Sequence, residues 1–229
     1  MPLSQCSCEG CELKMLFFEN VSTFEIESMC SRKVEREYKK GESIISEGTE
    51  IKDFIYLKQG LVKLLRGEDG DKEQIICFAG PLDFVSLLSI FTDTRYNYSV
   101  VALEDSVTCS INLAEVKTIA EQNGKFALGI TEKISKASDN IIHTLLEVKH
   151  RRLYGRIAYI LIFFSEKIYK TNVFELPVSR KEIAEFIGMT TENVIRTLSE
   201  LRKDGIIKIY GKTIEIVDME RLQGIDEHS

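Results

Sequence analysis

The chain has 229 residues, 44% of them hydrophobic, and a formal net charge of −6 at pH 7. This length predicts two modest domains, each with its own hydrophobic core. No apolar run approaches the roughly twenty residues that cross a bilayer, and residues 1–13 do not resemble a signal peptide, which excludes a membrane-spanning protein and predicts a cytoplasmic one.

The N-terminal tail, which we place at residues 1–19, is rich in thiols. The chain's six cysteines are Cys6, Cys8, Cys11, Cys30, Cys77 and Cys109. In a cytosolic protein such thiols are expected to be reduced and to serve metal or redox roles rather than structural disulfides. Cys6 or Cys8 could pair with Cys11 on oxidation, which would make a dithiol switch. Cys77 falls in an apolar run and is expected to pack in a core.

Short β-type runs alternate with turn signals between about residues 34 and 115. This pattern predicts an all-β domain, which we place at residues 20–122. The clearest runs, each bounded by glycine, are Ser43–Ile45, Phe54–Leu57, Leu61–Leu65 and Gln74–Phe78. Between the last two, Gly67–Gly70 is the strongest hairpin signal in the chain.

A helical period replaces the β pattern at residues 123–149. The apolar positions recur every three or four residues, close to a heptad seam, and are Phe126, Ile130, Ile134, Ala137, Ile141, Leu145 and Val148. Such a stripe is typical of a helix that pairs with a second copy, and equally of a helix that packs on its own domain. The seam stops near His150, and Gly155 precedes a new apolar helix, so we interpret this point as a hinge.

Residues 150–229 contain two helices joined by a tight turn. Ser179 with Glu182 three residues later forms a capping box, and Gly188 ends the first helix. Thr190 or Thr191 caps the second helix. Its buried stripe is Val194, Leu198 and Leu201, and the side chains that face outward are Thr191, Glu192, Ile195, Arg196 and Ser199. This is the pattern of a helix-turn-helix.

The outward face of the second helix suits base pairs in DNA. Arg196 can donate two parallel hydrogen bonds to guanine, and Glu192 can accept one from a cytosine amino group. The alternative is an ion pair between these two residues within the helix, worth only about 0.2–0.5 kcal/mol. Thr191 and Ile195 complete the predicted base-reading set.

Two further β-type runs, around Ile206–Ile209 and Lys212–Ile216, predict a wing and favour the DNA interpretation. Residues 151–229 hold 13 Lys or Arg and 12 Asp or Glu, so the chain's acidity lies in the other domain. Side chains suited to phosphate contacts surround the unit, namely Ser179, Arg180, Thr190, Ser199, Arg202, Lys203, Lys208 and Lys212.

The segments TTENVIRTLSEL and DGIIKIYGKTIEI resemble the recognition helix and wing of the CRP/FNR superfamily of bacterial transcription regulators, and the resemblance extends over nearly the whole chain. It implies an α+β fold, with a cupin-like β-roll sensor domain, a long dimerisation helix and a C-terminal winged helix-turn-helix. Glu192 and Arg196 fall on the family's base-reading positions, whereas Thr191 and Ile195 fall on positions that vary between its branches. We therefore expect a half-site core with a G·C pair, such as TGA.

The resemblance also implies partners. A homodimer would place two recognition helices on half-sites of a palindromic double-stranded operator, about 34 Å apart. RNA polymerase is a further partner by family resemblance alone. The chain contains no pattern of an enzyme site. A second class of function remains open, in which a sensor acts mainly through a protein partner that docks on the winged domain.

The segment around Cys109 is similar to the oxygen-sensing FNR branch near its internal cluster ligand. Cys6, Cys8, Cys11 and Cys109 would then hold one oxygen-labile [4Fe–4S] cluster. The single residue between Cys6 and Cys8 departs from that branch, and Cys30 could replace one of them. The alternative is a small-molecule or thiol-redox regulator without a cluster, in which Cys109 packs as a small hydrophobic residue.

The cyclic-nucleotide branch of the family holds its ligand through a Gly-Glu pair and an Arg-Ser pair. Here Leu87 stands where the glutamate would be, Asn97 and Tyr98 lie near the Arg-Ser positions, and Arg95 is out of register. Binding of cyclic AMP in the usual mode is therefore not expected. Haem is a weaker option, because none of the three histidines lies in the predicted roll.

Overall fold

The computed structural model describes residues 21, 32–68, 72–81, 83, 85–92 and 94–227. The chain divides into one compact unit of Met1–Lys72 and Ile76–Ile141 and another of Glu73–Ile75 and Ile142–Ser229. Within the described ranges, no helix has both the length and the apolar character needed to cross a bilayer. The cysteines at positions 6, 8, 11 and 30 lie outside these ranges.

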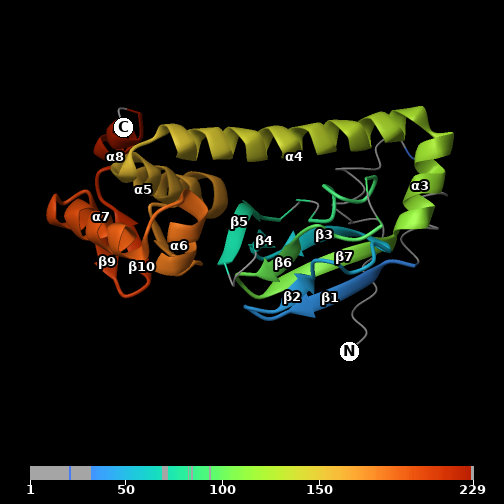
Figure 1. Ribbon diagram of the computed structural model, residues 1–229, viewed down its shortest axis with the longest axis horizontal. Helices are drawn as coiled ribbons and strands as arrows, with labels where there is room; N and C mark the ends of the chain where they lie inside the picture. Colours follow the sequence, from blue (N-terminus) through green and yellow to red (C-terminus); the bar gives the residue numbers. More distant parts are fainter. Residues whose placement is uncertain are drawn as a thin grey trace. The chain divides into compact units, whose positions relative to one another are not determined.

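The first unit is built on two sheets (Figure 1). One has the strand order β1-β7-β3, with bounds Val34–Tyr38, Ser106–Asn112 and Asp53–Gln59. The other has the order β2-β6-β4-β5, with bounds Ser43–Ile45, Ser99–Ala102, Val62–Glu68 and Lys72–Ala79. The predicted β-rich character is confirmed, including the paired runs on either side of the predicted hairpin, whose tip at residues 69–71 is not described. A helix at Leu113–Gln122 was not predicted, and the bounds 20–122 stay a prediction.

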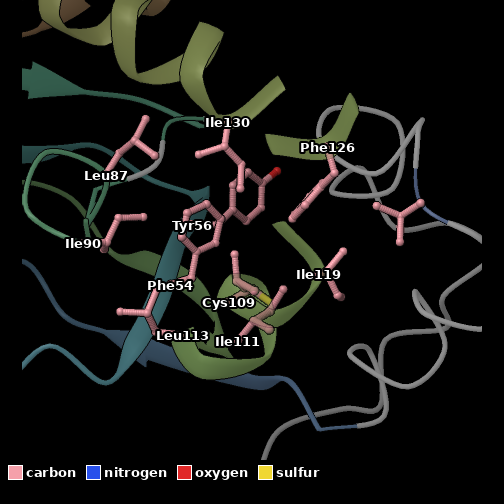
Figure 2. Close-up of a cluster of buried hydrophobic side chains, with 12 residues drawn as sticks. Phe54, Tyr56, Leu87, Ile90, Cys109, Ile111, Leu113, Ile119, Phe126 and Ile130 are labelled. Atoms are coloured by element: carbon pink, nitrogen blue, oxygen red, sulfur yellow. The ribbon is translucent and has the colours of Figure 1, made fainter. Parts of the chain in front are cut away.

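Strand β3 separates two hydrophobic cores. Because side chains alternate along a strand, Phe54 and Tyr56 enter one core and Leu57 enters the other. The first, which we call the helix-covered core, is drawn in Figure 2 and also contains Cys109 and Ile111 from β7. Helix α3 (Leu113–Gln122) adds three side chains to it, Leu113, Val116 and Ile119. The second core fills the interior between β2, β3, β4 and β6.

The first half of helix α4 (Gly124–His150) packs on its own unit, which corrects part of the predicted subunit seam. Phe126 and Ile130 are only 1% and 3% exposed, and both belong to the helix-covered core (Figure 2). Ile134 and Ala137 pack against the same core. Assigning Phe126 and Ile130 to an interface between subunits is therefore wrong, because their side chains are already covered within one chain.

The rest of the predicted seam is divided. Ile141 is half-buried, Val148 is buried within the second unit, and Leu145 is exposed. The exposed apolar side chains of α4 are instead Leu128, Ile142, Leu145 and Leu146. Leu128 and Ile142 are two heptads apart with Ser135 midway, so α4 carries a second stripe rotated from the one that the sequence suggested.

The second unit consists of helices and one three-stranded sheet (Figure 1). After α5 (Leu153–Ile162) and a π-helical segment η2 (Phe163–Tyr169), the helices are α6 (Arg180–Ile187), α7 (Thr191–Lys203) and α8 (Met219–Glu227). The sheet order is β8-β10-β9, with bounds Val173–Glu175, Thr213–Ile216 and Ile207–Tyr210. The predicted wing is confirmed as the β9–β10 hairpin, while β8 and η2 were not predicted.

Arg151 stands between α4 and α5, where the sequence suggested a hinge. Its guanidinium donates to the carboxylate of Asp226 in α8 and to the backbone oxygen of Glu147 at 2.8 Å. It also lies 4.9 Å from the centre of the Tyr159 ring. These contacts tie the last turn of α4 to α5 and α8, so within this unit the junction is braced rather than loose.

Gly60 makes the tight corner between β3 and β4. Its φ is +98°, and a Cβ added there would lie 2.3 Å from Ser106 Oγ and 2.8 Å from the Asp105 backbone oxygen. An L side chain is disfavoured by this φ, and the backbone neighbour cannot move without disturbing β7. Glycine is therefore required by both conformation and space.

We expect Gly60→Ala to lower the free energy of unfolding of the first unit by roughly 2–4 kcal/mol, measured by chemical denaturation. Gly80→Ala is the matched control, because an added Cβ at Gly80 has no neighbour within 4 Å and its φ is not positive. It should change stability by less than about 1 kcal/mol. Equal effects of the two substitutions would contradict the packing at this corner.

Candidate nucleic-acid interface

Two capped helices form the candidate interface. The Ser179 hydroxyl accepts from the backbone N–H of Glu182 at 3.2 Å, and the Glu182 carboxylate accepts from the backbone N–H of Ser179 at 2.7 Å. This is the predicted capping box of α6. Gly188 ends α6 in the left-handed region with φ +64°, which lets the chain turn directly into α7. Thr190 caps α7 by accepting from the N–H of Asn193 at 3.3 Å.

Helix α7 has one buried face and one exposed face. Val194, Leu198 and Leu201 are buried, as predicted, and Thr197 joins them. Glu192, Ile195, Arg196 and Ser199 are exposed, and Thr191 is half-buried. The predicted division of the helix into faces is thus confirmed, while contact of the exposed face with DNA stays a prediction.

Glu192 and Arg196 are not paired with each other, so the alternative of an ion pair within the helix does not describe this structure. The Arg196 guanidinium donates to the Asn193 side-chain oxygen at 3.0 Å. The backbone N–H of Glu192 and then the Thr190 hydroxyl hold the pKa of the Glu192 carboxyl below its ordinary value. The acid is therefore ionised at neutral pH, as an acceptor for a cytosine amino group must be.

Two residues of α5 that were not predicted from the sequence form hydrogen bonds to α6 and α7. Arg156 of α5 donates to the backbone oxygen of Ile187 at 2.9 Å, at the end of α6. The Tyr154 hydroxyl donates to the Glu200 carboxylate of α7 at 2.6 Å. Burial, followed by the hydrogen bond to Glu200, raises the pKa of Tyr154 to about 12, so this donor keeps its proton. These partners are distant in sequence, and no local pattern indicates them.

The residues predicted to contact the DNA backbone differ in how exposed their side chains are and in whether their charge is paired. Arg202 and Lys203 are exposed in the last turn of α7, and Lys212 is exposed at the tip of the wing. Lys208 lies 3.2 Å from the Glu215 carboxylate, so part of its charge is compensated within the wing. Arg180 is half-buried, and desolvation lowers its pKa. Arg202, Lys203 and Lys212 are therefore stronger candidates for phosphate contact than Lys208 and Arg180.

The two described thiols differ in exposure, because Cys109 is buried and Cys77 is half-buried. Cys109 is 2% exposed among the aromatic and aliphatic side chains of the helix-covered core (Figure 2). Burial, then the nearby Asp83 carboxylate, raises the pKa of Cys77 to about 12, which fits the predicted core position. In the described ranges, no group of three or more Cys, His, Asp or Glu is placed to hold a metal. Of the four thiols predicted as cluster ligands, the described residues thus include Cys109 alone.

The roll positions considered for a cyclic nucleotide are used for internal contacts. Leu87 is buried in the helix-covered core. The Tyr98 hydroxyl donates to the Val85 backbone oxygen at 3.0 Å, and Arg95 donates to the Gly48 backbone oxygen at 2.7 Å. Leu87 and Tyr98 therefore supply neither a carboxylate for a ribose nor a guanidinium for a phosphate, and the guanidinium of Arg95 is bound to the Gly48 backbone oxygen.

Two family descriptions match the chain. A cyclic nucleotide-binding domain matches residues 35–123, and a Crp-like helix-turn-helix domain matches residues 155–225. Together they cover more than two thirds of the chain. The first match identifies the roll, and the second includes the two capped helices and the wing.

Curated relatives extend over nearly the whole chain. The transcriptional activator protein anr of Pseudomonas aeruginosa is 27% identical over 94% of this chain and 91% of its own length. The nitrogen fixation regulation protein FixK of Bradyrhizobium diazoefficiens is 26% identical over 82% of this chain and 80% of its own. The solved structure of FixK2 from Bradyrhizobium japonicum has a TM-score of 0.77 at 21% identity, covering 86% of this chain and 98% of that one.

Proposed function

The chain belongs to the CRP/FNR superfamily of DNA-binding transcription regulators, and we propose that it acts as a homodimer on a palindromic operator. The observation that carries this proposal is the exposed face of α7. An ionised acid and a guanidinium lie one helical turn apart on it, next to exposed basic residues. Glu192 and Arg196 would read a C·G pair, and Arg202 and Lys203 would contact phosphates.

The exposed stripe of α4 supports a dimer. Ile142, Leu145 and Leu146 are about half exposed and recur at the spacing of one helix face. Toward the start of α4 the same stripe passes the small residues Ser138, Ser135 and Thr131 before Leu128. Apolar residues at both ends of a heptad stripe with small residues between them fit a helix that packs against its copy. This stripe replaces the predicted seam at Phe126 and Ile130.

The coupling between sensor and operator would use the same helix. Phe126 and Ile130 are anchored in the helix-covered core, and Ile142 and Leu145 face solvent further along α4. A signal that changes the packing of that core would shift α4 and bias two states of the dimer. The signal would thereby select the spacing of the two recognition helices. A contact with RNA polymerase is part of this proposal by family resemblance only.

The signal is a separate proposal. A [4Fe–4S] cluster would need Cys6, Cys8, Cys11 and Cys109, of which only Cys109 is described. Its support is that Val21 packs in the same core as Cys109, so a residue close after the tail reaches this thiol's surroundings. The apolar enclosure of Cys109 favours the alternative regulator without a cluster. Cyclic AMP remains unexpected as a ligand.

We expect Arg196→Ala to weaken binding of a duplex with two inverted TGA half-sites by about 1–3 kcal/mol and to relax specificity at the G·C pair. The reason is the loss of a bidentate contact to guanine. The measurement is fluorescence anisotropy of the full chain at fixed salt, under anaerobic conditions.

Arg202→Ala is the matched control, because it also removes an exposed guanidinium from α7. It should weaken binding about equally for all sequences and reduce the slope of log affinity against log salt concentration by about 2, because each subunit loses one phosphate contact. Unchanged affinity of the Arg196→Ala protein, with a protein partner still bound, would establish the alternative function as a protein-docking sensor.

Ile142→Lys should convert the dimer to a monomer, because two like charges would face each other across the seam. Analytical ultracentrifugation would show the change in mass. Asn140→Lys is the control, since residue 140 is exposed on the same helix but outside the stripe. A dimer that survives Ile142→Lys and dissociates with Asn140→Lys would place the interface elsewhere.

If the cluster proposal is right, anaerobically purified protein contains about four iron and four sulfide per chain, and Cys109→Ala loses them. Metal and sulfide assays with a visible absorption spectrum make the measurement. A colourless, iron-free protein would contradict the cluster and leave the regulator without one as the working assignment.

A further inference from the structure

Ile195 is an anomaly on the exposed face of α7. Every residue of this helix is described, and Ile195 is its one large hydrophobic side chain that is exposed, at 52%. The remaining apolar residues of the helix, Val194, Leu198 and Leu201, are buried. Single exposed hydrophobic residues are common on protein surfaces, so exposure alone does not assign a role.

The position of Ile195 distinguishes it from an incidental surface residue. It precedes Arg196 in sequence and lies about one turn after Glu192, so its side chain is next to that of Glu192 on the exposed side of α7. Its neighbours along the helix face, Thr191 and Ser199, are small. The Ser199 hydroxyl donates back to the Ile195 backbone oxygen at 2.8 Å, which directs it away from the Ile195 side chain's outer end. The branched side chain is therefore open to a ligand that approaches α7.

We propose that Ile195 reads a thymine by contact with its C5-methyl group, on a base pair adjacent to the G·C pair read by Glu192 and Arg196. The inference rests on the proposed function, which it deepens by naming a second base and its recognition chemistry. The thymine methyl is the apolar group that the major groove displays, and apolar side chains discriminate it from the other bases. Ile195 has no donor or acceptor, so this methyl is the feature of a base edge that it can select.

Deoxyuridine isolates this contact, because it differs from thymidine only by the methyl group. The probe is a duplex with inverted TGA and TCA half-sites, in which one thymine on each strand flanks the G·C pair. Each thymine is replaced in turn by deoxyuridine in both half-sites. Burial of one methyl is worth about fourfold in affinity. Because each replacement is made in both half-sites, the dimer should lose about tenfold or more in affinity for one of the two replacements.

Ile195→Ala should bind the thymine duplex more weakly and should no longer distinguish it from either deoxyuridine duplex. Ile195→Val keeps a branched apolar side chain and should keep most of the discrimination. Because Ile195 is exposed, neither substitution disturbs the buried stripe of α7. Circular dichroism melting of each variant verifies that the fold is retained.

The outcomes separate this inference from the proposed function. If Arg196→Ala abolishes specific binding while deoxyuridine has no effect on the unmodified chain, the regulator assignment stands and the role of Ile195 is wrong. An equal deoxyuridine effect in the Ile195→Ala protein would also overturn it. Absence of specific binding by the unmodified chain overturns both. If the unmodified chain distinguishes the thymine duplex from a deoxyuridine duplex and only the Ile195→Ala protein loses this distinction, both the regulator assignment and the role of Ile195 are supported.

Discussion

Burial of one face of α7 determines what the other face can do. Val194, Leu198 and Leu201 fill the core of the second unit, and each would lose about 1.5–3 kcal/mol if the helix rotated to expose it. The rotation of α7 about its own axis is thereby fixed, and with it the outward direction of Glu192 and Arg196. Arg156 and Tyr154, acting from α5, add hydrogen bonds to α6 and α7. A rigid helix of this kind can discriminate base pairs because its side chains do not have to be repositioned on binding.

Helix α4 also has one buried stripe and one exposed stripe, and here the exposed stripe is apolar. Its first half gives one stripe to the helix-covered core, while another stripe with Ile142 and Leu145 is left exposed. One helix would thus pack on the first unit along one stripe and, in the proposed dimer, against a second copy along another. This arrangement gives the proposed coupling a physical basis, because any rearrangement of the core acts on the helix that would form the subunit seam.

The sequence predicts features governed by neighbouring residues and not those governed by distant ones. The capping box at Ser179, the turn at Gly188 and the two faces of α7 follow from spacing, and the structure contains them. The α4 seam was misplaced because a heptad pattern does not reveal whether Phe126 packs on a partner or on its own unit. The contact of Arg156 with Ile187 and the pairing of β8 with β10 join residues far apart in sequence. No local pattern indicates such contacts, although family resemblance identified the architecture.

Two recognition helices related by a dimer axis must meet half-sites on one side of the duplex, and helical phasing tests this most directly. The measurement is the affinity of the full chain for inverted TGA half-sites with centres about one helical turn apart, and for the same duplex lengthened by roughly five base pairs. The account predicts tight binding to the first duplex and loss of cooperative binding to the second, whose half-sites face opposite sides. Equal affinity for the two duplexes would contradict a dimer that reads DNA through paired α7 helices.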